Sequence, residues 1–109
     1  MLFENLKIRG VNLKNRVVVS PMCQYSAKNG YIQTHHKTHY GQLAMGGAGL
    51  IFLEATGVTA QGRITNGCLG IWDDKQIKGL KEITQSIKVL GSIPACLLYT
   101  SDAADELCS

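Results

Sequence analysis

Two short β-type runs, each followed by a helical segment, constrain the fold of this chain more than any other feature of its sequence. Residues 16–19 form a β-branched run that Pro21 closes, because proline cannot donate a hydrogen bond to a neighbouring strand. Residues 49–54 form a second run with an apolar centre. Uninterrupted apolar runs are typical of strands buried on both faces of a parallel sheet. We therefore expect an α/β protein.

The two helical segments have recognisable ends. In the first, Thr34 is expected to cap a helix that stops at Gly46 and Gly47. The second begins at residues 73–74 and ends at Gly91, which stands where a helix-terminating glycine belongs. Apolar residues recur through it at spacings of three and four, which places them on one helix face. They are Ile77, Leu80, Ile83, Ile87 and Leu90.

The remaining segments complete a βα pattern. Residues 6–13 alternate around Arg9 and Gly10 and predict a small hairpin, and residues 93–95 predict the start of a third strand. The connection 55–72 is rich in glycine and predicts a loop with room for a hairpin. Alternating strands and helices indicate a parallel sheet with right-handed crossovers. Two such units cannot close a barrel, so we expect part of a larger α/β fold.

Charge and composition argue against several classes of function. The formal charge of +3 is small and the basic residues are scattered singly, which is unlike a nucleic-acid-binding or membrane-binding surface. No apolar run is long enough to span a bilayer, and the N-terminus lacks the order of a signal peptide, so we expect a cytoplasmic protein. The four cysteines have no metal-binding spacing and should be thiols.

Three other features favour ordinary structural roles. His35 and His39 lie one turn apart, but no glutamate follows His35 and no third ligand is apparent, so we expect no metal site. The glycine-rich residues 46–49 precede a strand, whereas a dinucleotide-binding fingerprint opens a helix, so they predict a turn. Arg63 is interpreted as a solvated loop residue rather than a phosphate ligand.

Four separated blocks resemble the Old Yellow Enzyme (NADH:flavin oxidoreductase) family. The first is residues 14–26, KNRVVVSPMCQYS, and the others are residues 49–55, 61–64 and 69–72. They occur in the family's order, and the resemblance extends from residue 1 to about residue 95. A cysteine at position 23 resembles the bacterial, thermophilic-like branch of the family.

The resemblance implies a TIM (β/α)8 barrel, of which this chain holds the N-terminal hairpin and the first two to three βα units, truncated. It also implies FMN bound at the carboxyl ends of the strands, where barrel enzymes place their chemistry. By position, Tyr25 is expected to bind the substrate, and no catalytic residue is expected in this chain. The residues implied in FMN binding are Ser20, Pro21, Met22, Cys23 and Ala55.

The implied activity is that of an FMN-dependent ene-reductase or NAD(P)H dehydrogenase. Family members pass a hydride from NADPH or NADH to FMN, and then to the β-carbon of an activated alkene. The parent protein is expected to be a homo-oligomer, and this chain alone is expected to be inactive. Two alternatives stay open: the N-terminal part of a 2,4-dienoyl-CoA reductase-like flavoenzyme, and a non-catalytic αβ fragment. The sequence does not give the physiological alkene or the nicotinamide preference.

The family resemblance ends after residue 95. Residues 96–106 resemble the conceptual translation of a transposase-based sequencing adapter. We therefore expect two parts: residues 1–95 as the N-terminal portion of a flavin oxidoreductase barrel, and residues 96–109 as a non-native tail. The alternative is an ordinary strand over residues 95–99 followed by an acidic segment.

Overall fold

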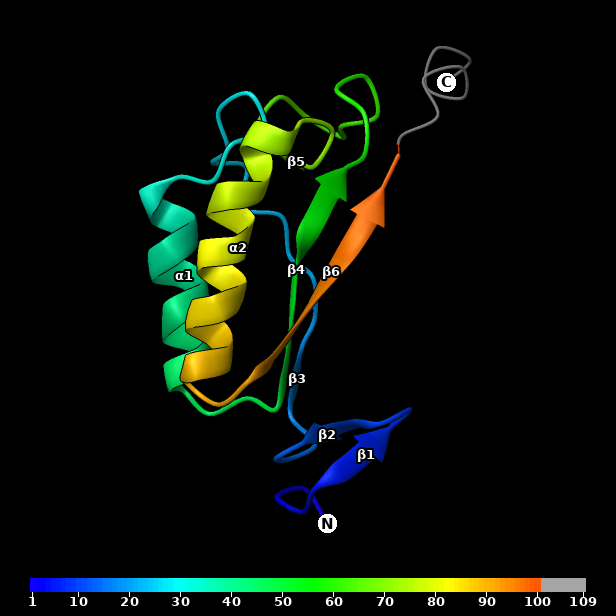
Figure 1. Cartoon of the computed structure of the whole chain (residues 1–109), viewed down its shortest axis with the longest axis vertical. Helices are drawn as coiled ribbons and strands as arrows, with labels where there is room; N and C mark the ends of the chain where they lie inside the picture. Colours follow the sequence, from blue (N-terminus) through cyan, green and yellow to red (C-terminus); the bar gives the residue numbers. More distant parts are fainter. Residues whose placement is uncertain (101–109) are drawn as a thin grey trace.

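Residues 1–100, the part of the chain that the computed structural model describes, form an antiparallel hairpin followed by a parallel sheet with two helices on one face (Figure 1). No helix within these residues is long and apolar enough to cross a membrane. The elements in chain order are β1 (Leu6–Ile8), β2 (Val11–Leu13), β3 (Val18–Val19), α1 (Thr34–Met45), β4 (Leu50–Gly57), β5 (Leu69–Gly70), α2 (Asp74–Val89) and β6 (Ile93–Tyr99).

Strand β4 is the centre of the parallel sheet. It pairs with β6 along nearly its whole length, from the Leu50–Ile93 pair onward. A strand has only two edges, so β3 and β5 share the opposite edge. There β3 lies beside the beginning of β4 and β5 beside its end. This arrangement confirms the predicted α/β fold with an N-terminal hairpin and parallel βα units.

Three strands, β4, β5 and β6, differ from the sequence-based expectation. β4 continues to Gly57, so Glu54 and Ala55 lie inside the strand rather than directly after it. β5 lies within the connection predicted as a loop, because a two-residue strand carries no periodic signal and forms only by pairing with β4. β6 runs past Ala95 to Tyr99. The predicted non-native tail is not tested by this, and its residues 101–109 lie outside the described residues.

Helix α1 begins differently from the prediction. Gln33, not Thr34, is the N-cap: its backbone is extended, and its main-chain N–H donates to Nδ1 of His36 at 2.9 Å. The Gln33 carbonyl in turn accepts from the His36 N–H at 3.0 Å. The sequence favoured threonine because hydroxyl caps are common. Here the first turn is closed by a histidine side chain instead.

Helix α2 has the predicted ends. The Asp73 carboxylate accepts from the Lys75 main-chain N–H at 2.9 Å, and Gly91 adopts the left-handed conformation that ends the helix. The buried face of α2 is narrower than the sequence predicted, because Ile77, one of the residues placed on it, is 45% exposed. Gln76 is buried in its place, where its Oε1 accepts from the Trp72 main-chain N–H.

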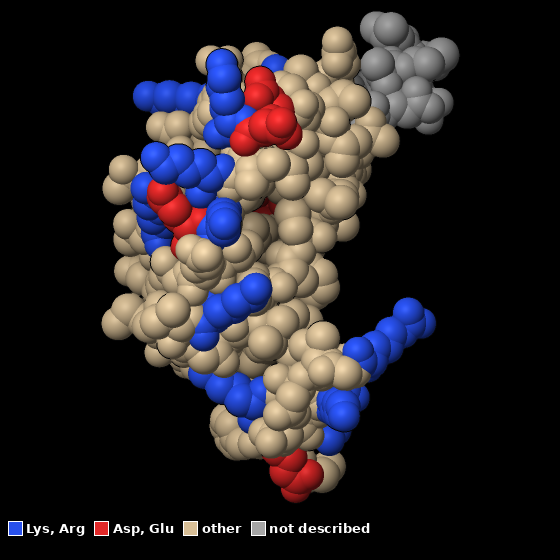
Figure 2. All heavy atoms as spheres, viewed as in Figure 1, with Lys and Arg blue, Asp and Glu red and all other residues tan. Residues whose placement is uncertain are grey.

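The core lies between the helices and one face of the sheet. Its side chains include Tyr40 of α1, Leu53 of β4 and Ile87 of α2, all essentially fully buried. The other side of the sheet carries apolar side chains in contact with solvent, such as Leu98, which is 58% exposed. Figure 2 shows charged residues over the helices and the hairpin and few over β4 and β6. The sheet is therefore covered on one face only.

The hairpin is attached to the sheet through Asn15. Its Nδ2 donates to the Gly47 carbonyl at 2.7 Å, and its Oδ1 accepts from the Val17 main-chain N–H at 3.0 Å. Gly49 lies so close that an added Cβ would clash with the Asn15 main-chain oxygen and lie 2.7 Å from its Oδ1. The turn before β4 therefore requires glycine at position 49.

The substitution Gly49→Ala should lower the free energy of unfolding of the intact protein by about 2 kcal/mol, because the backbone must move to admit the methyl group. Gly41→Ala is the matched control. Position 41 is inside α1 with open space around an added Cβ, so this change should stabilise by about 0.5–1 kcal/mol. Denaturant unfolding of both variants measures the difference, and equal stabilities would contradict the role given to Gly49.

Candidate functional site

The segment after β3 lies at the carboxyl end of the parallel sheet and holds four of the predicted cofactor contacts. Ser20 and Met22 are exposed, Met22 by 47%, whereas Pro21 and Cys23 are half-buried. The strand ends at Val19, so these residues follow it directly, as the sequence predicted. They present a mixed polar and apolar surface beside the strand ends.

Cys23 meets Ala55, the fifth predicted contact. The main-chain N–H of Ala55 lies close enough to the Cys23 sulfur to lower the pKa of this thiol, so the loop after β3 and strand β4 approach each other here. Burial raises the pKa of the Cys23 thiol above its ordinary value of 9.0, and nearby Cys68 and Glu54 raise it further, against the opposing effect of the Ala55 N–H. The Cys23 side chain is therefore a neutral thiol at neutral pH.

Tyr25 has an unusual backbone and is not enclosed. Its φ is +54°, in the left-handed region that non-glycine residues seldom adopt, and the residue is 64% exposed. Gly67 packs against its backbone so closely that a Cβ there would lie 2.7 Å from the Tyr25 carbonyl. The adjoining Ala27 N–H donates to the Gly67 carbonyl at 3.0 Å. Tyr25 is two residues beyond Cys23 in the chain. In the structure its side chain faces solvent.

A buried polar cluster joins β4, α1 and the loop after β3. The Tyr40 hydroxyl donates to Glu54 Oε1 at 2.9 Å and accepts from the Glu54 main-chain N–H at 2.9 Å. The other carboxylate oxygen, Oε2, accepts from the Gln24 main-chain N–H at 3.3 Å. Glu54 and His36 are both 0% exposed, and His36 Nε2 lies 3.7 Å from Glu54 Oε1.

The hydrogen bonds define the protonation of His36. Its Nδ1 accepts from the Gln33 N–H, so in the neutral ring the proton is on Nε2 and faces Glu54. Nε2 has no partner within hydrogen-bonding distance among the described residues. Burial lowers the pKa of His36 from 6.5, and the neighbouring His35 and His39 lower it further. Burial also raises the pKa of Glu54, against the hydrogen bonds from Tyr40 and Gln24.

An irregularity in β4 accounts for the position of Glu54. Three residue steps separate Leu53 from Thr56 in β4, but only two separate their partners Cys96 and Leu98 in β6. One residue of β4 is therefore extra, as in a β-bulge. In a regular strand, adjacent side chains point to opposite faces. Here both Leu53 and Glu54 are fully buried, Leu53 in the core that contains Tyr40 and Glu54 on the Tyr40 hydroxyl.

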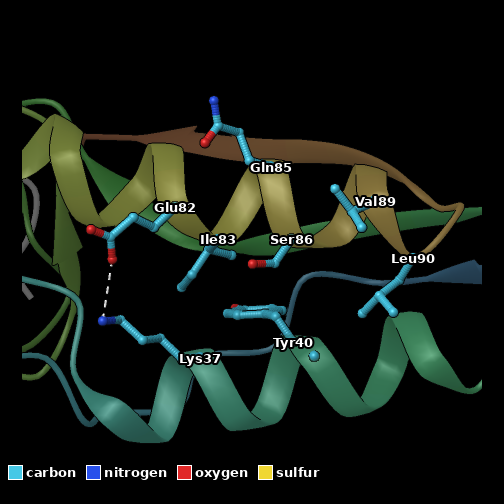
Figure 3. A pocket seen from close by; sticks show the side chains of 9 residues that line it. Lys37, Tyr40, Glu82, Ile83, Gln85, Ser86, Val89 and Leu90 are labelled. Atoms are coloured by element: carbon cyan, nitrogen blue, oxygen red, sulfur yellow. Dashed lines mark ion pairs between the residues drawn. The ribbon is translucent and has the colours of Figure 1, made fainter.

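Two cavities among the described residues lie away from these contacts. A groove of about 580 Å³ separates α1 from α2, with the Lys37–Glu82 ion pair (3.2 Å) at one end and Val89 and Leu90 at the other (Figure 3). The Tyr40 ring lines it, although the Tyr40 hydroxyl belongs to the buried cluster. A second hollow is lined by loop residues 60–66. Neither contains a predicted site residue.

Two other candidates have structural partners. His35 Nε2 hydrogen-bonds Gln24 Oε1 at 2.8 Å and its ring stacks on His39, with centroids 5.7 Å apart. Within residues 1–100, no three His, Cys, Asp or Glu side chains gather as a metal ion would require. Arg63 donates from Nε to the Ala60 carbonyl and lies 5.1 Å from the Trp72 ring centroid, a cation–π contact.

Comparison with known proteins is decisive on the family. The sequence profile described as the NADH:flavin oxidoreductase / NADH oxidase family matches residues 1–102. The chain belongs to this family.

Among curated proteins of this flavin oxidoreductase family, bacterial NADPH dehydrogenases are similar to the chain. The protein from Bacillus licheniformis is 52% identical over 99 residues, which cover 89% of this chain and 29% of that protein. The one from Bacillus cytotoxicus is 52% identical over 108 residues, which cover 97% and 31%. The chain thus spans about three tenths of the length of the relatives it matches. These relatives are bacterial, which agrees with the bacterial part of the predicted branch.

Solved structures of the same family agree with the fold. Morphinone reductase superposes with a TM-score of 0.84 at 30% identity, covering 91% of this chain and 26% of that protein. The Old Yellow Enzyme homologue from Zymomonas mobilis gives 0.83 at 28% identity, covering 91% and 28%. The hairpin and βα units therefore match the N-terminal part of the barrels of these flavin oxidoreductases, as predicted.

The buried cluster is the part of the site that sequence reasoning missed. His36 and Tyr40 were interpreted only as helix residues, and Glu54 as a strand-end residue. One signal was available, because a carboxylate inside an apolar strand must find hydrogen-bond donors. The spacing of His36 and Tyr40, one helical turn, places both on the same face of α1.

Acidification should destabilise the protein through His36. Since the folded pKa lies below 6.5, the unfolded chain takes up a proton that the folded chain does not, so this contribution to stability is lost as pH falls from about 6.5 through the folded pKa. The lowered pKa of His39 also makes the protein less stable as pH falls. The raised pKa of Glu54 acts in the opposite direction, because its contribution to stability is lost as pH rises from 4.5 through the folded pKa.

The change His36→Gln should therefore flatten the fall in unfolding free energy between pH 7 and 5. Denaturant unfolding across this range measures it. His35→Gln, measured alongside, should flatten the fall less, because His35 only adds to the lowering of the His36 pKa that burial causes. An identical pH profile for His36→Gln and the unsubstituted protein would disprove the assignment.

Proposed function

We propose that this chain is the N-terminal part of an FMN-dependent ene-reductase that oxidises NAD(P)H and reduces activated alkenes. One observation carries the proposal: Cys23, after β3, and Ala55, inside β4 two residues before its end, meet near the carboxyl edge of a parallel sheet. This edge is where barrel enzymes bind cofactors. The names of the relatives support it, since they are NADPH dehydrogenases, and morphinone reductase was solved in complex with tetrahydroNAD.

The residues present fit one side of a flavin ring. Ala55 is small and buried in β4, so a planar group could approach the strand backbone closely. Cys23 offers a neutral thiol, and the exposed Met22 an apolar surface. Ser20 and Pro21 complete the wall. When bound, FMN would supply hydride transfer, and the protein's share is to hold the ring and adjust its environment.

Tyr25 is assigned to the substrate. Its hydroxyl would donate a hydrogen bond to the carbonyl conjugated with the alkene, which polarises the double bond toward hydride addition at the β-carbon. The exposed position of Tyr25 supports this role, because the ring is free to contact a ligand beside the strand ends. We propose further that the whole protein is a cytoplasmic homo-oligomer.

A 2,4-dienoyl-CoA reductase-like flavoenzyme is the closest alternative, and it would use the same wall. The half-covered sheet favours a third view for this chain in isolation, that of an inactive αβ fragment, because its apolar face needs further strands. That residues 96–109 are a non-native tail also stays a prediction. Independent genomic reads past the codon for Ala95 test it, and a stop codon directly after Ser109 would contradict it.

The intact protein should purify yellow with bound FMN and oxidise NADPH in the presence of cyclohex-2-enone. Absorbance of the released flavin and the loss of NADPH absorbance measure the two properties. A colourless preparation that does not take up added FMN would overturn the proposal. A 2,4-dienoyl-CoA that is reduced much faster than cyclohex-2-enone would favour the alternative.

The change Tyr25→Phe should raise the KM for cyclohex-2-enone up to about tenfold through loss of one hydrogen bond, with FMN affinity unchanged. Tyr31→Phe is a matched control, because Tyr31 is another exposed tyrosine of the same loop. Steady-state kinetics and flavin fluorescence measure KM and FMN binding. Equal KM values for the two variants would remove Tyr25 from the substrate site.

A further inference from the structure

We infer that Glu54 is a positioning residue, which acts through Gln24 to hold Tyr25 in the conformation that the proposed substrate site needs. This inference rests on the proposed function for the role of Tyr25, whereas the mechanical link between Glu54 and the loop is independent of it. The fully buried Glu54 carboxylate accepts a hydrogen bond from Gln24, and the exposed Tyr25 is the next residue in the chain.

Gln24 is held at both its main chain and its side chain. Its N–H donates to Glu54 Oε2, at 3.3 Å. Its side-chain Oε1 bonds to His35 Nε2 at 2.8 Å, and its Nε2 donates to the Met22 carbonyl at 2.9 Å. The residue between Cys23 and Tyr25 is thereby tied to β4, to α1 and to its own loop.

Tyr25 needs such support. A left-handed backbone costs a non-glycine residue free energy, and strained residues persist only where their surroundings impose the conformation. The Tyr25 side chain is largely exposed, so its own packing supplies little of that constraint. The backbone contact with Gly67 limits the loop on one side, and the bonds of Gln24 limit it on the other. Release of Gln24 would let Tyr25 relax to an ordinary conformation.

Stability of the core alone does not explain a carboxylate at position 54. Burying an ionisable group is costly, and an apolar side chain of similar size often serves a core as well or better. The two oxygens of Glu54 also have separate partners: Oε1 faces Tyr40 and His36, and Oε2 faces Gln24. Only the second contact reaches the loop that carries the predicted site.

The test compares Glu54→Met, which removes both acceptor oxygens, with Glu54→Gln, which keeps one. Glu82→Met is the matched control, because Glu82 is a partly exposed carboxylate of α2 paired with Lys37. Each variant is made in the full-length protein. Hydrogen exchange of the Gln24 amide is measured in flavin-free protein, and KM and kcat for cyclohex-2-enone are measured with FMN bound.

We expect Glu54→Met to speed exchange of the Gln24 amide about tenfold and to raise KM about tenfold, with kcat and FMN affinity changed much less. Glu54→Gln should recover part of both effects, and Glu82→Met should show neither. A purely structural role would instead lower flavin content, kcat and stability together. A folded Glu54→Met protein with unchanged exchange and KM would overturn the inference.

His35→Ala is a second variant in case Glu54→Met does not fold. It removes a side-chain bond to Gln24 from an exposed position, so the core is undisturbed. It should give smaller changes of the same kind, and unchanged exchange and KM would overturn the inference. If the unsubstituted protein binds no FMN, the proposed function fails, but the exchange measurement still decides whether Glu54 holds the loop.

Discussion

The parallel pairing of β4 with every other strand of its sheet is the constraint on which the rest of this structure depends. Because β6 occupies one edge of β4, β3 and β5 must share the other. That arrangement brings the loop after β3 beside the carboxyl-terminal half of β4, where Cys23 meets Ala55. The helices follow from it too, since right-handed crossovers place α1 and α2 on the same face of the sheet (Figure 1).

Much of this fold could be predicted from local sequence signals. The 3.6-residue periodicity of α2, the aspartate at its start and Gly91 at its end all act within a few residues, so they are visible in the sequence. β5 could not be found in this way, because Leu69 and Gly70 are a strand only through their pairing with Thr56 and Gly57. The N-cap of α1 was assigned to the wrong residue because a histidine side chain replaced the expected hydroxyl.

The candidate site likewise has a part that the sequence indicates and a part that depends on residues distant in the chain. Family resemblance pointed to the loop after β3 and to Ala55, and the structure brings Cys23 and Ala55 together. The partners of Glu54 are 14 and 30 residues away along the chain, so no local pattern announces them. Burial was the only available clue, because a carboxylate in an apolar strand requires donors from elsewhere. The need of the Glu54 carboxylate for hydrogen-bond donors predicts that it has polar partners, but it does not identify which residues they are.

The extra residue in β4 also affects how this strand compares with its relatives. Before the bulge, Ile51 and Leu53 are core residues, two positions apart, as simple alternation requires. Beyond the bulge, the one extra residue shifts the alternation by one position, so that side chains at odd and even positions change faces. A substitution scan that treated β4 as uniformly alternating would assign the wrong face to the residues after Leu53. A relative that lacked the extra residue would align perfectly in sequence up to that point and then present its following side chains to the opposite side of the sheet.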